Sequence, residues 1–248
     1  MSCYKPKTKD KYLGIEIEFY SKYSTDYIET LFNKNKILKS FCKLGEDSSI
    51  NTDYSDGLEL RILTKQKNLK VKMNIVQDFL KLIDAEVNNS CGLHIHLDAR
   101  HYDPTKMLKN LINNLDGIEK SVPSYRLNNN YSNSIKHVSD KMLEMIKHYR
   151  EGKKNTVYNH NGLHYYYTYL VPGYTECRYR SINIESILEH KTIEVRCHEG
   201  TTSCAEIYKW CKYLSEVAYE GKISETNQNY IKKRIITKGK YEAKRITQ

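Results

Sequence analysis

Four short segments of the sequence carry charged or imidazole side chains at every second position. They are GIEIEF at 14–19, GLELRI at 57–62, GLHIHLD at 92–98 and TIEVRCHEG at 192–200. Successive residues of a β-strand point to opposite faces, so each segment predicts a strand with one apolar and one polar face. The ten polar-face positions hold five carboxylates, three histidines and two arginines: Glu16, Glu18, Glu59, Arg61, His94, His96, Asp98, Glu194, Arg196 and His198.

The ordinary explanation for this alternation is an antiparallel sheet with one face in water. The composition argues against it, because lysine outnumbers arginine 31 to 9 in the chain while the ten positions contain no lysine. A solvated face in so lysine-rich a protein should itself be rich in lysine. Carboxylates gathered on one face would repel one another unless cations lay among them. We therefore interpret the polar face as a site for metal and phosphate.

The side-chain types narrow the chemistry of this site. Several carboxylates with one or two imidazoles suit Mg²⁺ or Mn²⁺, whereas a single catalytic zinc needs only three protein ligands. Arg61, Arg180 and Arg196 supply cationic forks for phosphate oxygens. Metal ions beside arginines are typical of phosphoryl transfer from a nucleotide. The chain has no P-loop, kinase glycine loop or GxGxxG motif, so a nucleotide would have to lie on the sheet itself.

The elements that must position these residues follow from hydrophobic periodicity. The pattern predicts strands at 12–20, 58–63, 91–98 and 191–197, and helices at 26–39, 68–84, 103–118, 134–150 and 203–219. Residues 155–181, dense in Tyr, His and Asn, are expected to be irregular or a strand with a long loop. The fold class is α+β, an antiparallel sheet with flanking helices. We expect one domain over 1–221 and an appendage over 222–248.

The appendage is strongly basic in a chain of net charge +10. Between Lys222 and Arg245 there are eight Lys or Arg residues against two glutamates. This segment is either an arm that contacts nucleic acid or another polyanion, or a solvated, partly disordered tail. The second interpretation is favoured, because no base-reading motif accompanies the charge.

Cysteine usage and hydropathy bear on the compartment. The seven cysteines include no CxxC pair, and no apolar run approaches the about 20 residues that span a bilayer. Cys197, Cys204 and Cys211 lack metal-ligand spacing and are expected to be buried as small apolar residues. No signal peptide is visible, so free thiols in the cytoplasm and no membrane contact are predicted. The abundance of Lys, Asn, Ile and Tyr is typical of AT-rich genomes; for a viral or phage protein, the compartment would be the host cytoplasm.

The order of these motifs resembles the putative amidoligase family of the carboxylate–amine ligase superfamily, which includes glutamate–cysteine ligases and glutamine synthetases. The matching pieces are Gly14 to Glu18, Glu46-Asp47-Ser48-Ser49, Gly57 to Arg61, Cys91 to Asp98, Arg178 to Asn183 and Thr192 to Thr201. The resemblance implies a glutamine synthetase-like catalytic domain whose curved sheet forms a basin. It also implies ATP-dependent amide-bond formation, in which a carboxylate becomes an acyl phosphate and an amine displaces the phosphate.

The resemblance further implies roles for individual residues. Glu16, His94 and Glu194 would hold a Mg²⁺ ion on the ATP phosphates. Glu18 and Glu59, with Asp47 as a further candidate, would hold an ion nearer the substrate. Arg180 and Arg196 would stabilise the transferring phosphoryl group, and they would bind the nucleotide together with His96 and Arg61. The partners would be a small-molecule or peptide carboxylate and an amine.

Two other functions remain open from the sequence. A metal-dependent hydrolase would use the same His and Glu cluster to activate water without ATP. A non-enzymatic nucleic-acid or partner-binding protein would use the basic appendage and would be indifferent to Glu16 and Glu194. Single residues also have structural explanations: Asp98 is expected to cap its strand, Arg61 can pair with a neighbouring glutamate, and His198 can be a satisfied polar residue.

Overall fold

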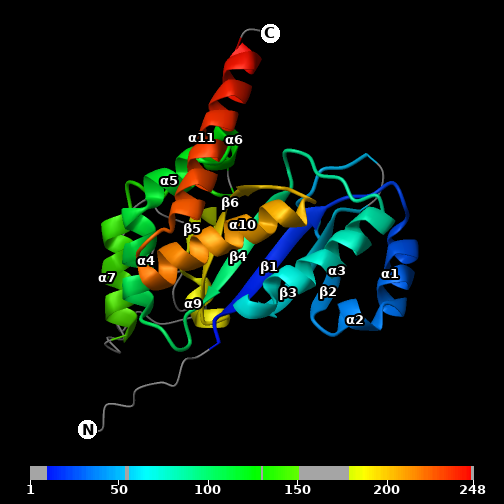
Figure 1. The fold of residues 1–248 in the computed structure, drawn as a ribbon, viewed down its shortest axis with the longest axis horizontal. Coiled ribbons are helices and arrows are strands. Elements are labelled where there is room, and N and C mark those ends of the chain that lie inside the picture. Colours follow the sequence, from blue (N-terminus) through cyan, green and yellow to red (C-terminus); the bar gives the residue numbers. More distant parts are fainter. Residues whose placement is uncertain (1–9, 54–55, 130, 151–178, 247–248) are drawn as a thin grey trace.

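The computed structural model describes residues 10–53, 56–129, 131–150 and 179–246, and a six-stranded antiparallel sheet lies at its centre (Figure 1). The strand order is β2-β3-β1-β4-β6-β5, and the sheet is open. The strands are β1 (Tyr12–Phe19), β2 (Cys42–Glu46), β3 (Leu58–Lys65), β4 (Gly92–Asp98), β5 (Ile182–Asn183) and β6 (Thr192–Glu199). The predicted α+β class is therefore confirmed, while the glutamine synthetase-like form of the sheet stays a prediction.

The four predicted strands are β1, β3, β4 and β6, which are neighbours in the middle of the sheet. The two edge strands, β2 and β5, were missed. In β2, only Cys42 and Leu44 are apolar and the next position of that face is Glu46, while β5 has only two residues, too few for any periodic signal. The sequence signal was strong only where a strand has one face in the core and the other in the site.

In the described ranges, the α-helices are α1 (Thr25–Lys34), α2 (Lys36–Lys39), α3 (Leu69–Leu82), α4 (Pro104–Asn113), α5 (Leu115–Lys120), α6 (Ser124–Leu127), α7 (Ser139–Arg150), α9 (Ser186–Glu189), α10 (Cys204–Ser215) and α11 (Glu225–Ile246), and short 3-10 and π-helical turns lie at Gln66–Asn68 and Glu216–Glu220. Two predicted helices are each divided at an asparagine. Asn35 ends α1, and its side chain accepts a hydrogen bond from Leu38 N to start α2. Asn114 divides 103–118 into α4 and α5. Asparagine bonds its own backbone readily, which favours such breaks.

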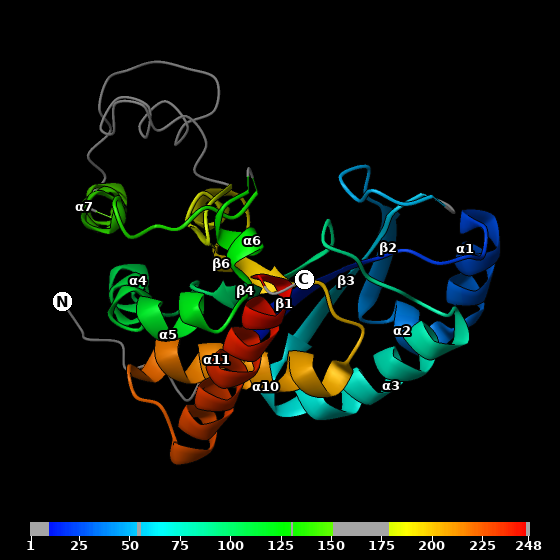
Figure 2. The ribbon, with the colours of Figure 1, turned by 90° about the horizontal axis from the view of Figure 1, so that it is seen from above.

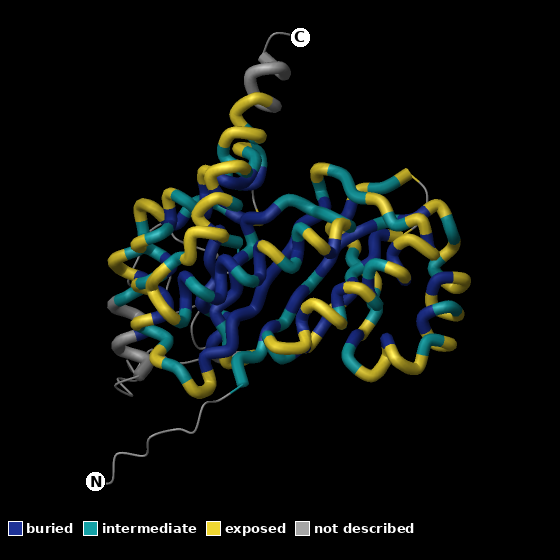
Figure 3. The backbone as a smooth tube through the Cα atoms, in the orientation of Figure 1, coloured by how far each residue is buried: buried dark blue, intermediate teal, exposed yellow. Residues whose placement is uncertain are grey.

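The apolar face of the sheet is the floor of the main core. Ile15, Ile17, Leu60 and Ile95 are fully buried there, and α3 and α10 lie on this side of the sheet (Figure 2). The central strands are accordingly the most buried part of the backbone (Figure 3). Cys197, Cys204 and Cys211 are buried free thiols, as predicted. Within the described ranges, no helix combines the length and apolarity of a bilayer span.

A bulge between β4 and β6 reverses the side-chain alternation at the end of β6. Leu93 pairs with His198 and Ile95 with Val195, so β6 has one extra residue between these pairs. His198 is therefore fully buried on the apolar side of the sheet, where its ring centroid lies 5.0 Å from the ring centroid of Trp210. The prediction that His198 shares the polar face with Glu194 and Arg196 is wrong, because a bulge shifts the two-residue period.

Residues 225–246 form a long helix instead of the partly disordered tail that the composition favoured. Helix α11 rises from the body of the protein in Figure 1, and its first half is anchored. Arg234 Nη2 donates to both carboxylate oxygens of Glu199, at 2.7 and 2.8 Å, and Nη1 donates to Glu206. Ile231 is buried in the core. The division of the chain into 1–221 and 222–248 stays a prediction.

The anchoring of α11 gives the protein an acid-sensitive contact. Burial alone would raise the pKa of Glu206, but the nearby imidazole of His198 and hydrogen bonds from Tyr230 and Arg234 outweigh it and lower the pKa to about 2. A carboxyl whose pKa is lower in the folded state stabilises the fold at neutral pH, and this contribution is lost as pH falls from about 5 towards about 2. We expect Glu206→Gln to reduce the free energy of unfolding by about 1 to 2 kcal/mol at pH 7, after allowance for solvent screening.

Urea denaturation of wild type and variant at several pH values measures this difference. The two unfolding curves should converge as pH falls from about 5 to about 2. A difference that stays constant over this range would contradict the role given to Glu206.

Candidate functional site

The polar faces of the four central strands bring most of the predicted residues together. Glu16 lies directly opposite Arg61 on β3 and His94 on β4. The same register places Glu18 opposite Glu59, and His96 opposite Glu194. Directly opposed side chains in an antiparallel sheet are close enough to touch. The antiparallel pairing thus gathers four carboxylates from three strands around the two imidazoles of a fourth.

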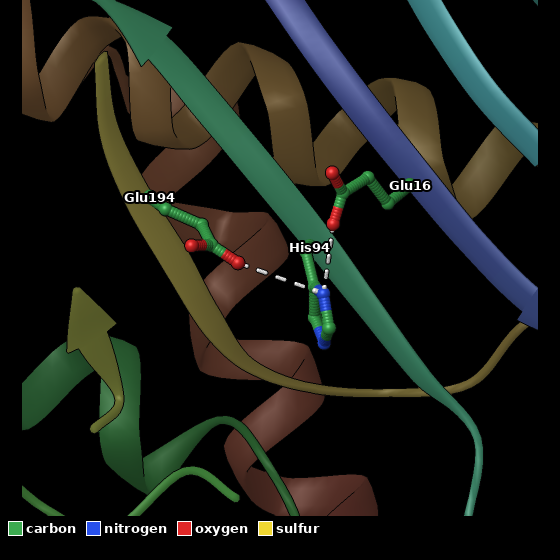
Figure 4. A group of neighbouring side chains, drawn as sticks. All are labelled: Glu16, His94 and Glu194. Atoms are coloured by element: carbon green, nitrogen blue, oxygen red, sulfur yellow. Dashed lines mark hydrogen bonds and ion pairs between the residues drawn. The ribbon is translucent and has the colours of Figure 1, made fainter. Parts of the chain in front are cut away.

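His94 is at the centre of a first set of possible ligands, here called trio A (Glu16, His94 and Glu194). Its Nδ1 lies 3.1 Å from Glu16 Oε2 and 3.6 Å from Glu194 Oε1. Figure 4 shows the carboxylates of β1 and β6 approaching the imidazole of β4 from two sides. One ligand atom from each residue lies within 4.8 Å of the others, close enough for all three to bind a single ion.

The other nitrogen of the same imidazole belongs to a second set, trio B (Glu18, Glu59 and His94), which is equally compact. His94 Nε2 lies 3.3 Å from Glu18 Oε1. The backbone N–H of Gly92 donates to Glu18 Oε2 at 2.5 Å, which fixes that carboxylate. Glu59 also accepts a bond from Arg61 Nε at 2.8 Å. The two trios therefore share one residue and approach it from opposite ends of its ring.

The charges of the trios are unevenly compensated. Burial raises the pKa of Glu59 to about 7, and the nearby charge of Glu16 adds to the effect while Arg61 opposes it. Burial also acts to raise the pKa of Glu16, but hydrogen bonds with His94 and His96 outweigh it and the net shift is downward. The pKa of the buried Glu194 is likewise lowered, because the charges of Arg196 and His96 oppose the effect of burial. The pKa of Glu59 in trio B is thus raised although Arg61 pairs with it, whereas the pKa values of Glu16 and Glu194 in trio A are lowered.

The donor set fits a hard divalent cation. Four carboxylates and one imidazole offer the oxygen-rich environment that Mg²⁺ and Mn²⁺ prefer. A neutral imidazole has one lone pair and one N–H. If His94 Nδ1 is a metal ligand in trio A, its Nε2–H donates to Glu18 of trio B. Such a bond orients both the imidazole and the carboxylate, as outer-shell contacts do in metal sites.

Asn183 orients Glu194 and was missed by the sequence analysis. Its Nδ2 donates to Glu194 Oε2 at 2.7 Å, while Arg196 Nη1 donates to Glu194 Oε1 at 2.6 Å. Both oxygens of this buried carboxylate are therefore held in place. Asn183 lies on the short strand β5, and its only sequence signal was membership of the 178–183 piece of the resemblance.

His96 is engaged on both sides of its ring. Its Nε2 lies 3.2 Å from Glu16 Oε1, and its Nδ1 lies 3.0 Å from Thr192 Oγ1. Burial alone would lower the pKa of His96, but the contact with Glu16 and the charge of Glu194 raise it. These contacts support a role in orienting Glu16. The predicted contact between His96 and the nucleotide stays a prediction.

Arg126, on the short helix α6, is the second site residue that the sequence analysis missed. Its side chain is buried, with Nη1 donating to Cys91 O at 3.3 Å and Nη2 to Arg196 O at 3.1 Å. Its Nη2 also lies beside Gly92, the residue that holds Glu18. A lone arginine in VPSYRLNNN carries no pattern, so only the packing of α6 against β6 identified it.

The remaining predicted residues lie around these groups. Arg61 is half exposed and pairs with Glu59 of its own strand. Arg180 forms a backbone bridge with Asn133 two residues before β5, and its contact with phosphate stays a prediction.

The carboxylate of Asp47 accepts bonds from the N–H and hydroxyl of Ser49. The carboxylate of Asp98, the last residue of β4, accepts bonds from the backbone N–H and the guanidinium of Arg100, as expected for a residue that caps the strand. Residues 155–178 of the Tyr-rich segment lie outside the described residues.

Comparison with models of protein families gives a match over much of the chain. The model of the family described as "putative amidoligase enzyme" matches residues 62–218 of the chain. The matched range contains His94 and Glu194 and begins just after Glu59 and Arg61. No curated protein matches the chain.

Proposed function

The chain belongs to the putative amidoligase enzyme family, and we propose that it is an ATP- and Mg²⁺-dependent ligase that joins a carboxylate to an amine. The observation that carries the proposal is the pair of trios sharing His94, beside the guanidinium of Arg196. Phosphoryl transfer commonly uses two adjacent metal ions and an arginine, which neutralise the negative charge of the transferring group.

In the proposed reaction, the substrate carboxylate attacks the γ-phosphorus of ATP, which breaks the bond to ADP and gives an acyl phosphate. The amine nitrogen then attacks the acyl carbon, phosphate leaves, and the amine loses a proton. Trio A would hold the ion on the ATP phosphates, and Glu18 and Glu59 would hold the ion nearer the carboxylate. Bound there, Mg²⁺ would neutralise the charge of the phosphates. The substrates would be small molecules or peptides that carry these groups.

The protein's own side chains would supply the remaining stabilisation. A guanidinium has five N–H donors. In Arg196, Nη1 donates to Glu194 Oε1 and Nε donates to Tyr131 O. Further donors remain to bind the transferring phosphoryl group, a role in which we also place Arg180. Arg61 and His96 would contact the nucleotide. Asn183 would keep Glu194 in position while the charge on its neighbours changes.

Calorimetric titration with a non-hydrolysable ATP analogue, with and without Mg²⁺, tests the proposal. Wild type should bind the analogue only with the metal, and Glu194→Gln should lose this binding because it removes an anionic ligand of trio A. Glu225→Gln, which makes the same change at an exposed position on α11, should bind like wild type. Phosphate release from ATP can then be screened with mixtures of carboxylates and amines.

The other outcomes separate the competing functions. Turnover of a substrate with metal but without ATP would establish a hydrolase in place of the ligase. Absence of nucleotide binding under both conditions would overturn the ligase proposal and favour a binding protein.

A further inference from the structure

A pocket of about 510 Å³ lies between α11, α10 and the loops that precede β4 and α6. In Figure 1, α11 passes α5 and α6 as it rises from the body. The pocket is lined by Asn89, Ser121, Pro123, Tyr125, Glu199, Glu206, Lys209, Tyr230, Lys233, Arg234, Thr237 and Lys238. None of these residues belongs to trio A or trio B. The volume is in the range of small-molecule sites, about 300 to 1,000 Å³.

One face of α11 lines this pocket. The helix contributes positions 230, 233, 234, 237 and 238, whose spacing of three and four residues defines a single helical face. Ile231 and Ile235 pack against the core beside this face, and the partly buried Tyr230 of the face also packs there. A face needed only for packing would be apolar, whereas this one presents two lysines and an arginine to the pocket. The side chains that line the pocket from α11 are therefore mostly polar or cationic.

The charge of the lining favours an anionic ligand. Arg234 lies between Glu199 and Glu206 and bonds to both, so these three side chains together carry one formal negative charge. Lys209 of α10 and Lys233 and Lys238 of α11 add three ammonium groups, so the formal charges of the lining residues sum to +2. A phosphate monoester carries about −1.5 to −2 at pH 7, which matches this excess.

The same lining offers an aromatic surface. The hydroxyl of Tyr230 donates to Glu206 at 2.7 Å, which holds its ring in one orientation at the pocket wall. Tyr125 and Pro123 contribute the wall supplied by the start of α6. Bases stack on such rings in a sequence-tolerant way, with about 1 to 3 kcal/mol per base. Phosphate-binding lysines beside tyrosines are the combination that single nucleotides and single-stranded nucleic acids require.

We propose that this pocket binds a nucleotide unit, with its phosphate at Lys209 and Lys233 and its base against Tyr125 or Tyr230. The unit is either a free nucleotide or one nucleotide of a single strand. The inference does not rest on the ligase reaction, because it uses no residue of the candidate metal site. Under this proposal, Lys233 of the basic segment 222–248 binds the phosphate of a nucleotide, whereas the sequence predicted only a general attraction of the segment to polyanions.

Point variants test the proposal better than deletion of α11, because deletion would also remove Arg234 and Ile231 from their buried contacts. The pocket variant is Lys209→Ala/Lys233→Ala, in which both side chains are exposed at the pocket edge. The matched control is Lys232→Ala/Lys240→Ala, which removes two exposed charges of α11 that do not line the pocket. Both pairs reduce the net charge equally, so a general electrostatic effect would be the same in each.

Binding of inorganic phosphate, AMP and a short fluorescein-labelled single-stranded oligonucleotide is measured in EDTA, which excludes metal–ATP binding. AMP or the oligonucleotide should bind to wild type and more weakly, by about tenfold or more, to the pocket variant, while the control changes little. The Glu194→Gln variant should bind like wild type. Binding of AMP alone identifies a free nucleotide as the source, and binding of the oligonucleotide alone identifies a nucleic acid.

Three results would overturn the proposal. Equal weakening by both lysine pairs would mean non-specific attraction to α11. Phosphate binding as tight as AMP binding would remove the role of the tyrosines. No binding of any of the three probes would leave the pocket without a nucleotide ligand.

Discussion

Replacing His94 by alanine is expected to abolish metal binding in both trios, whereas Glu16→Gln or Glu59→Gln should remove one ion each. The reason is that His94 offers Nδ1 to Glu16 and Glu194 and Nε2 to Glu18. Removing it takes a ligand from trio A and the hydrogen-bond donor that orients Glu18 in trio B. Loss of an outer-shell partner alone lowers metal affinity about 10- to 100-fold, and loss of a direct ligand should cost more.

Titration with Mn²⁺, followed by electron paramagnetic resonance of the free ion, measures the number of ions bound and their affinities. Wild type should bind two ions, each glutamine variant one, and His94→Ala none at comparable concentrations. His137→Ala removes an exposed imidazole and serves as the control, with unchanged binding expected. If His94→Ala still bound two ions with the affinity of wild type, the shared role of this imidazole would be refuted.

Gly92→Ala is expected to destabilise the protein and to disturb the side chains of trio B. A Cβ at Gly92 would lie 2.6 Å from Arg126 Nη2, 2.9 Å from His94 Nε2 and 3.2 Å from Glu18 Oε2. Three charged or imidazole groups thus converge over this Cα, and all three side chains are buried. The methyl group would displace at least one of them, at a cost of about 1 to 3 kcal/mol in unfolding free energy. Separation of His94 from Glu18 should also weaken Mn²⁺ binding by about tenfold or more.

Gly239→Ala provides the matched control, because a Cβ there meets nothing within 4 Å. Since Gly239 lies within α11, the change should stabilise the protein by up to about 1 kcal/mol and leave metal binding intact. Urea denaturation and Mn²⁺ titration of both variants make the comparison. Wild-type stability and metal binding in Gly92→Ala would show that the close approach at Gly92 has no functional consequence.

Much of the site could be predicted because it lies on regular strands. The alternation in β1, β3 and β4 assigned Glu16, Glu18, Glu59 and His94 to one face, and pairing places them side by side. The same period failed at His198, where the bulge in β6 turns the side chain to the core. A two-residue period is reliable only while the ladder is regular, and one inserted residue reverses every later assignment.

The sequence by itself determined that Glu16, Glu18, Glu59 and His94 share the polar face of the sheet, because this follows from side-chain type and a two-residue period. The tertiary structure decided what no local pattern carries: the order of the strands, the sharing of His94 by two trios and the entry of Arg126 and Asn183 from short elements. The tertiary structure also decided that the basic segment is an anchored helix. Arg234 of α11 pairs with Glu199 of β6 and Glu206 of α10, and these residues come together only in the packed fold. Such contacts join residues far apart in the chain, and only the packed fold brings them within hydrogen-bonding distance.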